Sequence, residues 1–102
     1  MAEIPTADDL AEYLALTGAS YPPEQLEEAI DSALVMQEDA CVVDPYTAPL
    51  REAALRRGAR LLAGRGAPLG VMDMGEFGTS YLVRLDAHIE EFEKNYRRGG
   101  FV

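Results

Sequence analysis

The chain has one cysteine, one histidine and no tryptophan among its 102 residues. The single cysteine, Cys41, excludes a disulfide within the chain, and no group of Cys and His has the spacing of a zinc site. Nowhere do about 18 apolar residues follow one another, and the first residues have neither a basic region nor an apolar run. We therefore expect reducing surroundings, no membrane partner and no targeting segment.

Residues that could carry catalysis are also scarce. His88 has no nucleophile paired with it in the sequence, and Cys41 falls on an apolar stripe where a thiol acts as a small hydrophobe. Adjacent carboxylates on a helix point about 100° apart, so such pairs do not converge on one metal ion. These pairs are Asp8/Asp9, Glu27/Glu28 and Glu90/Glu91. The sequence thus predicts no enzyme, no metal and no cofactor, and an enzyme remains open only if a site forms between subunits.

Basic residues are absent from the first 48 positions. That part carries eleven acids, whereas the remainder carries nine cations and seven acids, which together give the net charge of -9. The two parts should attract each other. Two explanations stay open: the acidic part packs beside the Arg-rich segment of the same chain, or it pairs with the next copy in a ring.

Composition favours one folded domain over residues 1–102. Hydrophobic residues make up 48% and charged residues 26%, which suits a small globular core better than disorder. The residue pattern is mainly helical, with punctuation for about four helices. The predicted fold class is therefore mainly α, a small bundle with a glycine-rich extended loop or short β-hairpin between the third and fourth helices.

The first two helices have clear boundaries in the sequence. Thr6 with Asp9 three residues later is an acidic variant of a capping box, and Gly18 ends this short helix. The Pro22–Pro23 pair starts a longer helix that we expect to reach about Val43. Its predicted inner stripe consists of Leu26, Ile30, Ala33, Leu34, Gln37 and Cys41.

The third helix is expected to begin at Thr47 or Ala48, with Pro49 in its first turn. Gly58 lies inside it and is expected to admit a neighbouring helix closely. The predicted inner side consists of Leu50, Ala53, Ala54, Leu61 and Leu62. Three of its arginines, Arg56, Arg57 and Arg60, share a broad face at helical spacing.

After this helix the pattern changes. Glycines punctuate residues 64–78, and residues 79–85 suit a short extended run. Asp86 is then a good N-cap for a last helix, which Gly99–Gly100 ends and whose C-terminal dipole Arg97 and Arg98 suit. Its predicted apolar edge consists of Ile89, Phe92 and Tyr96.

The glycine-rich segment and the chain end hold many large apolar residues for a connection and a tail. They are Leu69, Val71, Met72, Met74, Phe77, Tyr81, Phe101 and Val102. Connections so rich in apolar side chains indicate a surface that another polypeptide covers. We expect the flexible tail at 99–102 to bind an axial partner, and we take these residues together with Arg56, Arg57 and Arg60 as candidate subunit or partner contacts.

Several of these elements together resemble the head-to-tail adaptor (connector) proteins of long-tailed bacteriophages, in particular phages of actinobacterial hosts. The likeness lies in the Ala-rich helix at 51–62, the Pro-Leu-Gly-Val element at 68–71, Phe77 with Gly78, and the run at 81–84. It extends over about residues 6–98 and includes a last helix that ends in Tyr and Arg.

The resemblance implies a mostly helical structural protein of the virion neck, present in the host cytoplasm during assembly. Such subunits form a ring, typically of twelve copies, between the portal above and the next neck or stopper protein below. Genomic DNA would pass through the ring without sequence-specific binding. An acidic helical DNA mimic that inhibits a nucleic-acid-binding protein is the alternative, which the acids of the first half favour and the Arg-rich helix opposes.

Overall fold

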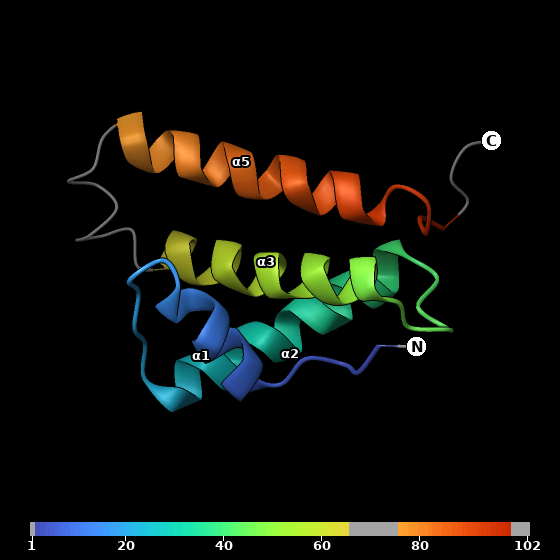
Figure 1. Cartoon of the computed structure of the whole chain (residues 1–102), viewed down its shortest axis with the longest axis horizontal. Helices are drawn as coiled ribbons and strands as arrows, with labels where there is room; N and C mark the ends of the chain where they lie inside the picture. Colours follow the sequence, from blue (N-terminus) through green and yellow to red (C-terminus); the bar gives the residue numbers. More distant parts are fainter. Residues whose placement is uncertain (1, 66–75, 99–102) are drawn as a thin grey trace.

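The computed structural model describes residues 2–65 and 76–98, which form four helices (Figure 1). They are α1 (Ala7–Ala15), α2 (Pro23–Ala40), α3 (Ala48–Arg65) and α5 (Glu76–Glu93). The predicted mainly helical bundle is confirmed. The glycine-rich segment at 66–75 and the tail at 99–102 lie outside the described residues.

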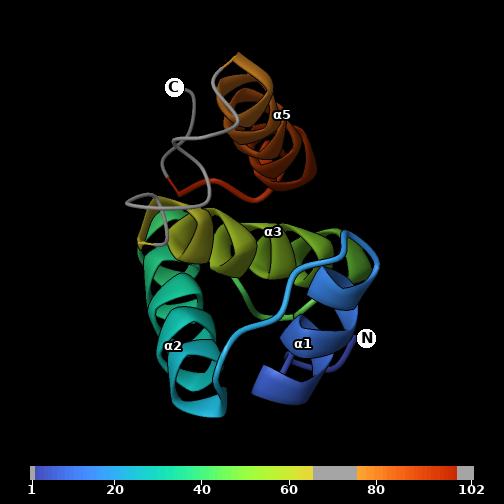
Figure 2. The same cartoon turned by 90° about the vertical axis from the view of Figure 1, so that its left-hand side faces the viewer.

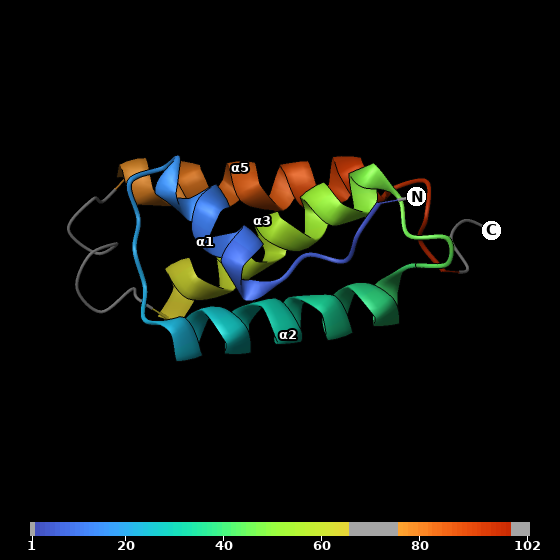
Figure 3. The same ribbon diagram turned by 60° about the horizontal axis from the view of Figure 1, so that its bottom comes forward.

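Helix α3 forms the centre of the bundle. Helix α5 runs antiparallel along one side of α3, while α1 and α2 pack against the opposite side (Figure 1). Seen along the bundle, α1 and α2 diverge below α3 (Figure 2), and the tilted view shows the beginning of α1 close to α2 (Figure 3). The molecule therefore has one flank bordered by α2 and a different flank bordered by α1.

The predicted starts of α1 and α2 are confirmed. The backbone N–H of Thr6 donates to the Asp9 carboxylate at 2.9 Å, and the Asp9 N–H donates to the Thr6 hydroxyl at 3.3 Å. Pro23 is the first residue of α2. This helix ends at Ala40, not near Val43, because Cys41 adopts extended backbone angles and pairs as an isolated bridge with Arg97.

The close approach predicted at Gly58 is also confirmed. A Cβ atom at Gly58 would lie 3.0 Å from Cδ2 and 3.2 Å from Cδ1 of Leu10, whose side chain is fully buried. Only a residue without a side chain lets α1 pack this closely on α3. The close contact with Leu10 thus explains why glycine stands in the middle of a helix, where alanine would otherwise be favoured.

The extended run predicted at 79–85 and the helix start predicted at Asp86 are wrong. Helix α5 begins at Glu76 and continues through Asp86. Leu85 and Ile89, four residues apart, are both buried, so packing on α3 requires helical geometry on both sides of Asp86. The side chain of Asp86 binds Arg60 of α3 instead of capping its own helix.

The end of α5 differs from the prediction as well. The helix ends at Glu93, so Tyr96 lies beyond it in a turn and Arg97 and Arg98 are not in its last turn. Arg98 donates from its backbone to the Ala40 carbonyl at 2.8 Å and from Nε to the Glu38 carbonyl at 2.9 Å. The Arg98 cation therefore interacts favourably with the C-terminal end of the α2 dipole.

The core has two clusters of buried side chains. The larger joins all four helices through Leu10, Leu14, Leu26, Ala29, Ile30, Leu55, Ala59, Leu62 and Leu85. The smaller consists of Cys41, Tyr46 and Leu50. All members of the predicted α2 stripe are buried except Leu34, which is half-buried. The predicted inner side of α3 is correct except for Leu61, which is half-buried. Three buried residues of α3 were not predicted: Leu55, Ala59 and Ala63.

Candidate interaction surfaces

A buried ion pair joins α3 and α5, the two helices that pack most extensively against each other. Glu93 is fully buried, and the Arg57 guanidinium binds it in two places, from Nε to Oε2 at 2.8 Å and from Nη2 to Oε1 at 2.6 Å. Two parallel hydrogen bonds of this kind fix both the position and the orientation of the partners. Arg57 is therefore held by its own chain.

Gln37 extends this ion pair into a network. Its Nε2 donates to Glu93 Oε2 at 3.0 Å and to the Leu50 carbonyl at 2.7 Å, while its Oε1 accepts from the Tyr46 hydroxyl at 2.9 Å. The network consequently ties α2, the 41–47 connection, α3 and α5 together. Buried polar groups that are satisfied in this way favour one arrangement of the helices over others.

The network shifts the acidity of its members. Burial by itself would raise the pKa of Glu93, but the hydrogen bonds from Arg57 and Gln37 and the Arg57 charge outweigh it and hold this pKa below the usual value. Burial and the Glu93 carboxylate raise the pKa of the Cys41 thiol to about 11. Cys41 is fully buried, as predicted, and its thiol is protonated at neutral pH.

Acid is expected to destabilise the fold through Glu93. Because its folded-state pKa lies below the ordinary 4.5, ionised Glu93 contributes stability that is fully present above pH 4.5 and is lost as the pH falls through the lowered value. The unfolding free energy, measured by denaturant titration across this range, should decline less steeply in Glu93→Gln than in the wild type. Asp9, whose pKa is lowered chiefly by the Thr6 N–H, keeps some acid sensitivity in both proteins. Equal slopes would contradict the role assigned to Glu93.

Two further arginines of α3, Arg56 and Arg60, also have partners within the chain. Arg56 binds Glu52 at 2.7 Å and lies over the rings of Tyr13 and Phe92, with 5.4 and 5.0 Å to their centroids. Arg60 Nε lies 3.0 Å from Asp86. Each of the three arginines of the predicted face, Arg56, Arg57 and Arg60, thus binds a different acid of the chain. Together they do not form an open cationic surface.

An ion pair between described residues connects the acidic and the basic parts of the sequence. It joins Arg51 and Asp9 at 3.0 Å. Arg56, Arg57 and Arg60 bind acids of their own half of the sequence. The partner of Arg56 is Glu52 of α3, and those of Arg57 and Arg60 are Glu93 and Asp86 of α5. Intramolecular neutralisation between the halves therefore holds at Arg51, and the acids along α2 remain largely on the surface.

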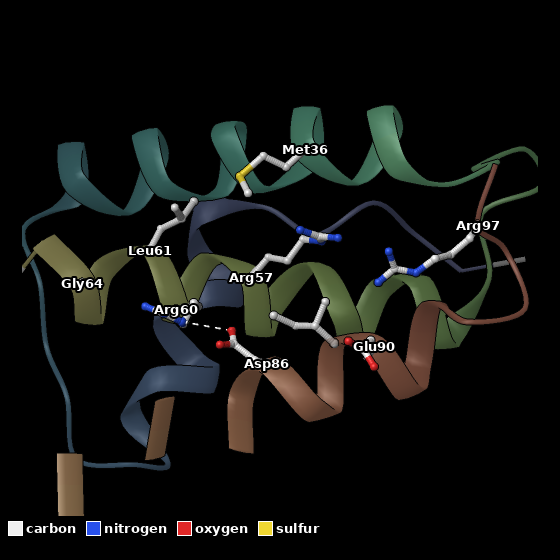
Figure 4. A pocket seen from close by; sticks show the side chains of 9 residues that line it. Met36, Arg57, Arg60, Leu61, Gly64, Asp86, Glu90 and Arg97 are labelled. Atoms are coloured by element: carbon white, nitrogen blue, oxygen red, sulfur yellow. Dashed lines mark hydrogen bonds and ion pairs between the residues drawn. The ribbon is translucent and has the colours of Figure 1, made fainter. Parts of the chain in front are cut away.

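A groove lies between α2 and α5, with α3 as its floor (Figure 4). It has a volume of about 530 Å³. The lining residues are Met36, Arg57, Arg60, Leu61, Gly64, Asp86, Ile89, Glu90 and Arg97. In the close-up the guanidinium of Arg97 points into the groove toward that of Arg57, and no acid among the described residues pairs with Arg97. We call this the α2–α5 groove.

The flank bordered by α1 has a different character. A shallower hollow of about 390 Å³ there is lined by Asp9, Glu12, Tyr13, Leu16, Arg51 and Leu55. Leu16, the residue that ends α1, is 86% exposed. The α1 flank therefore presents carboxylates and a protruding apolar side chain.

Most of the other predicted contact residues cannot be placed. Leu69, Val71, Met72, Met74, Phe101 and Val102 lie outside the described residues, and Phe77 and Tyr81 belong to α5 with their side chains outside that description. Sequence reasoning did not single out Leu16 as an exposed residue or Arg97 as part of a groove. For Leu16 the available signal was its position two residues before Gly18, the predicted helix stop. Arg97 fell inside the predicted last helix, so no signal in the sequence marked it.

No family model, curated protein or solved structure matches the chain. Within residues 2–65 and 76–98, no cluster of three or more His, Cys, Asp or Glu has the geometry to hold a metal ion. No helix in the same residues has the length and apolar character needed to cross a membrane.

Proposed function

We propose that this chain is a ring-forming adaptor of a bacteriophage neck, which joins the portal to the next neck or stopper protein. The ring, of about twelve copies in related necks, would surround the channel through which genomic DNA passes. The proposal starts from the resemblance of residues 6–98 to connector proteins. It is supported by the mainly helical bundle, which is the architecture that the resemblance implies.

The observation that carries the proposal is the presence of two unlike flanks. One flank has the α2–α5 groove with Arg97, and the other has Glu12 and the exposed Leu16. Copies that meet through two different surfaces repeat in one direction, and they close into a ring when the rotation between them allows it. A subunit of a ring needs such a pair of surfaces.

The buried network supports the same role. A neck subunit must keep its shape under load, and the contacts of Glu93 with Arg57 and Gln37 tie three of the four helices together. The exposed acids of α2 suit a channel that DNA slides through, because they repel phosphates where basic residues would hold them. They are Glu24, Glu27, Asp31, Glu38 and Asp39.

The same acids also favour the second candidate, a DNA mimic. A mimic, however, gains from acidic residues over most of its contact surface, and α2 exposes Val35 and Met36 beside them. Exposed apolar residues of this kind fit a protein contact better than they fit imitation of a phosphate backbone. We therefore place the adaptor first.

Electron microscopy of the protein mixed with purified portal rings tests the two candidates. The adaptor function predicts an additional layer with a symmetry that matches the portal, and an unrelated acidic protein of similar size serves as the control. A DNA mimic would leave portals bare and would compete with duplex DNA for a basic protein. That second result would contradict the neck function.

A further inference from the structure

The end of α1 presents an acid and an apolar side chain to solvent on one side of the helix. Glu12 and Leu16 are four residues apart, so they are neighbours on the helix surface, and both are exposed. Leu16 is 86% exposed, more than any other large hydrophobic residue of the described chain. An exposed leucine beside a carboxylate makes a small, distinctive projection.

The α2–α5 groove has the complementary chemistry. Met36, which is 44% exposed, and the half-buried Leu61 provide an apolar surface at its α2 side. Arg97 directs into the groove, from the end near the α5 C-terminus, a guanidinium that pairs with no acid of residues 2–65 and 76–98 (Figure 4). The groove can therefore accept an apolar side chain and a carboxylate at the same time.

The charges within the groove show which cation is available. Glu93 already occupies Arg57 and Asp86 already binds Arg60, so Arg97 is the cation left for an incoming carboxylate. Glu90 lines the α5 edge and would repel it. Arg97 is thus the group that would attract an incoming carboxylate, and Glu90, which lies at the same end of the groove on α5, would weaken that attraction (Figure 4).

We propose that the α2–α5 groove receives the C-terminal end of α1 from a second copy of this chain, with Leu16 against Met36 and Leu61 and with Glu12 beside Arg97. This inference deepens the proposed neck function and rests on it for the ring, while the contact itself can be tested alone. Because the α2–α5 groove and the end of α1 lie on different flanks of the bundle (Figure 2), the contact joins unlike surfaces. A pair of copies therefore keeps one unused groove and one unused α1 end. Each added copy then offers the same site to the next.

Cysteine cross-linking between two variants tests the contact. L16C and M36C, one of them carrying a mass tag, are mixed at high concentration and oxidised mildly. The proposal predicts a disulfide between L16C and M36C that forms faster than any link in either variant alone. The wild type is the control, because its buried Cys41 should give no link. Links that form equally well between identical variants, or no link at all, would overturn the proposal.

Charge variants give an independent measurement by sedimentation velocity. Arg97→Gln should weaken self-association and Glu90→Gln should strengthen it, although both remove one charge from the same groove. Leu16→Asn should weaken association about tenfold or more, because an apolar contact is lost. Effects of equal sign for Arg97→Gln and Glu90→Gln would overturn the assignment of the acid to Arg97.

Three further outcomes separate this contact from its alternatives. A disulfide within one chain between M36C and V102C, formed in preference to the link with L16C, would assign the groove to the chain's own end and overturn the proposal. Portal rings that gain a layer in which L16C and M36C do not link would leave the neck function intact and refute the contact. Linking without any binding to portals would support the contact and refute the neck function.

Discussion

Replacement of Glu93 by alanine is expected to lower the unfolding free energy by about 3–5 kcal/mol, the cost of removing one partner of a buried ion pair. The Arg57 side chain, 13% exposed, would keep its charge with no carboxylate to bind. Gln37 would also lose the acceptor of one of its two donated hydrogen bonds. Denaturant unfolding followed by circular dichroism measures the loss.

Two control variants show whether the loss of stability in E93A comes from the ion pair. Glu90→Ala removes an exposed acid from the same helix and should change the unfolding free energy by less than about 0.5 kcal/mol. The double variant R57M/E93L replaces both ions with apolar side chains and should recover much of the stability lost in E93A. If E93A costs no more than E90A, the ion pair does not hold α5 on α3.

Truncation of Leu10 to alanine is expected to cost about 2–5 kcal/mol, because this side chain is fully buried where α1 meets α3. The L10A variant should also reverse the effect of Gly58→Ala, on α3, on the unfolding free energy. In the wild type, Gly58→Ala places a methyl group 3.0 Å from Leu10 Cδ2 in a packed core and should destabilise the protein. In the L10A background that contact is gone, and Gly58→Ala should stabilise α3 by up to about 1 kcal/mol.

Gly64→Ala is the matched control on the same helix. Among the described residues, a Cβ at Gly64 would meet only Arg60 Nη1, at 3.7 Å, which is an ordinary contact. This substitution should be neutral or stabilising in both backgrounds. A stabilising effect of G58A in the wild type, equal to that of G64A, would contradict the close packing of α1 on α3.

The parts of the fold that could be predicted from sequence are those that local chemistry decides. The capping box at Thr6 and the proline at position 23 set helix starts through neighbouring residues, and the structure has both. The start of α5 could not be found in this way. Gly78 and the β-branched and aromatic residues that follow favour an extended run, and packing on α3 overrides that preference.

The burial of Glu93 was missed for a related reason. Beside Glu90 and Glu91 it resembles one more member of a solvated acidic face, and its partner Arg57 lies 36 residues away in the sequence. A signal did exist, because position 93 continues the spacing of four set by Leu85 and Ile89 and therefore falls on the buried side of α5. Charge alone argued against that position, and only the tertiary partner makes it favourable.

The charge asymmetry of the sequence pointed to attraction between the two halves. Within the described residues such attraction is seen between Asp9 and Arg51, while Asp86 and Glu93 of α5 bind two other arginines of α3. Acids such as Glu12, Glu27 and Asp31 lie exposed on the surface. The first explanation, packing within one chain, therefore holds at Arg51, and head-to-tail pairing of neighbouring copies stays a prediction.

The most direct test of the repeating, one-directional assembly is the cross-linking of the double variant L16C/M36C in the presence of portal rings, analysed on a denaturing gel without reductant. The account predicts a ladder of regular multiples that ends at a single largest species, because unlike surfaces link every copy to the next until the ring closes. Products that stop at the dimer, or a chain that stays monomeric on rings it has bound, would contradict it.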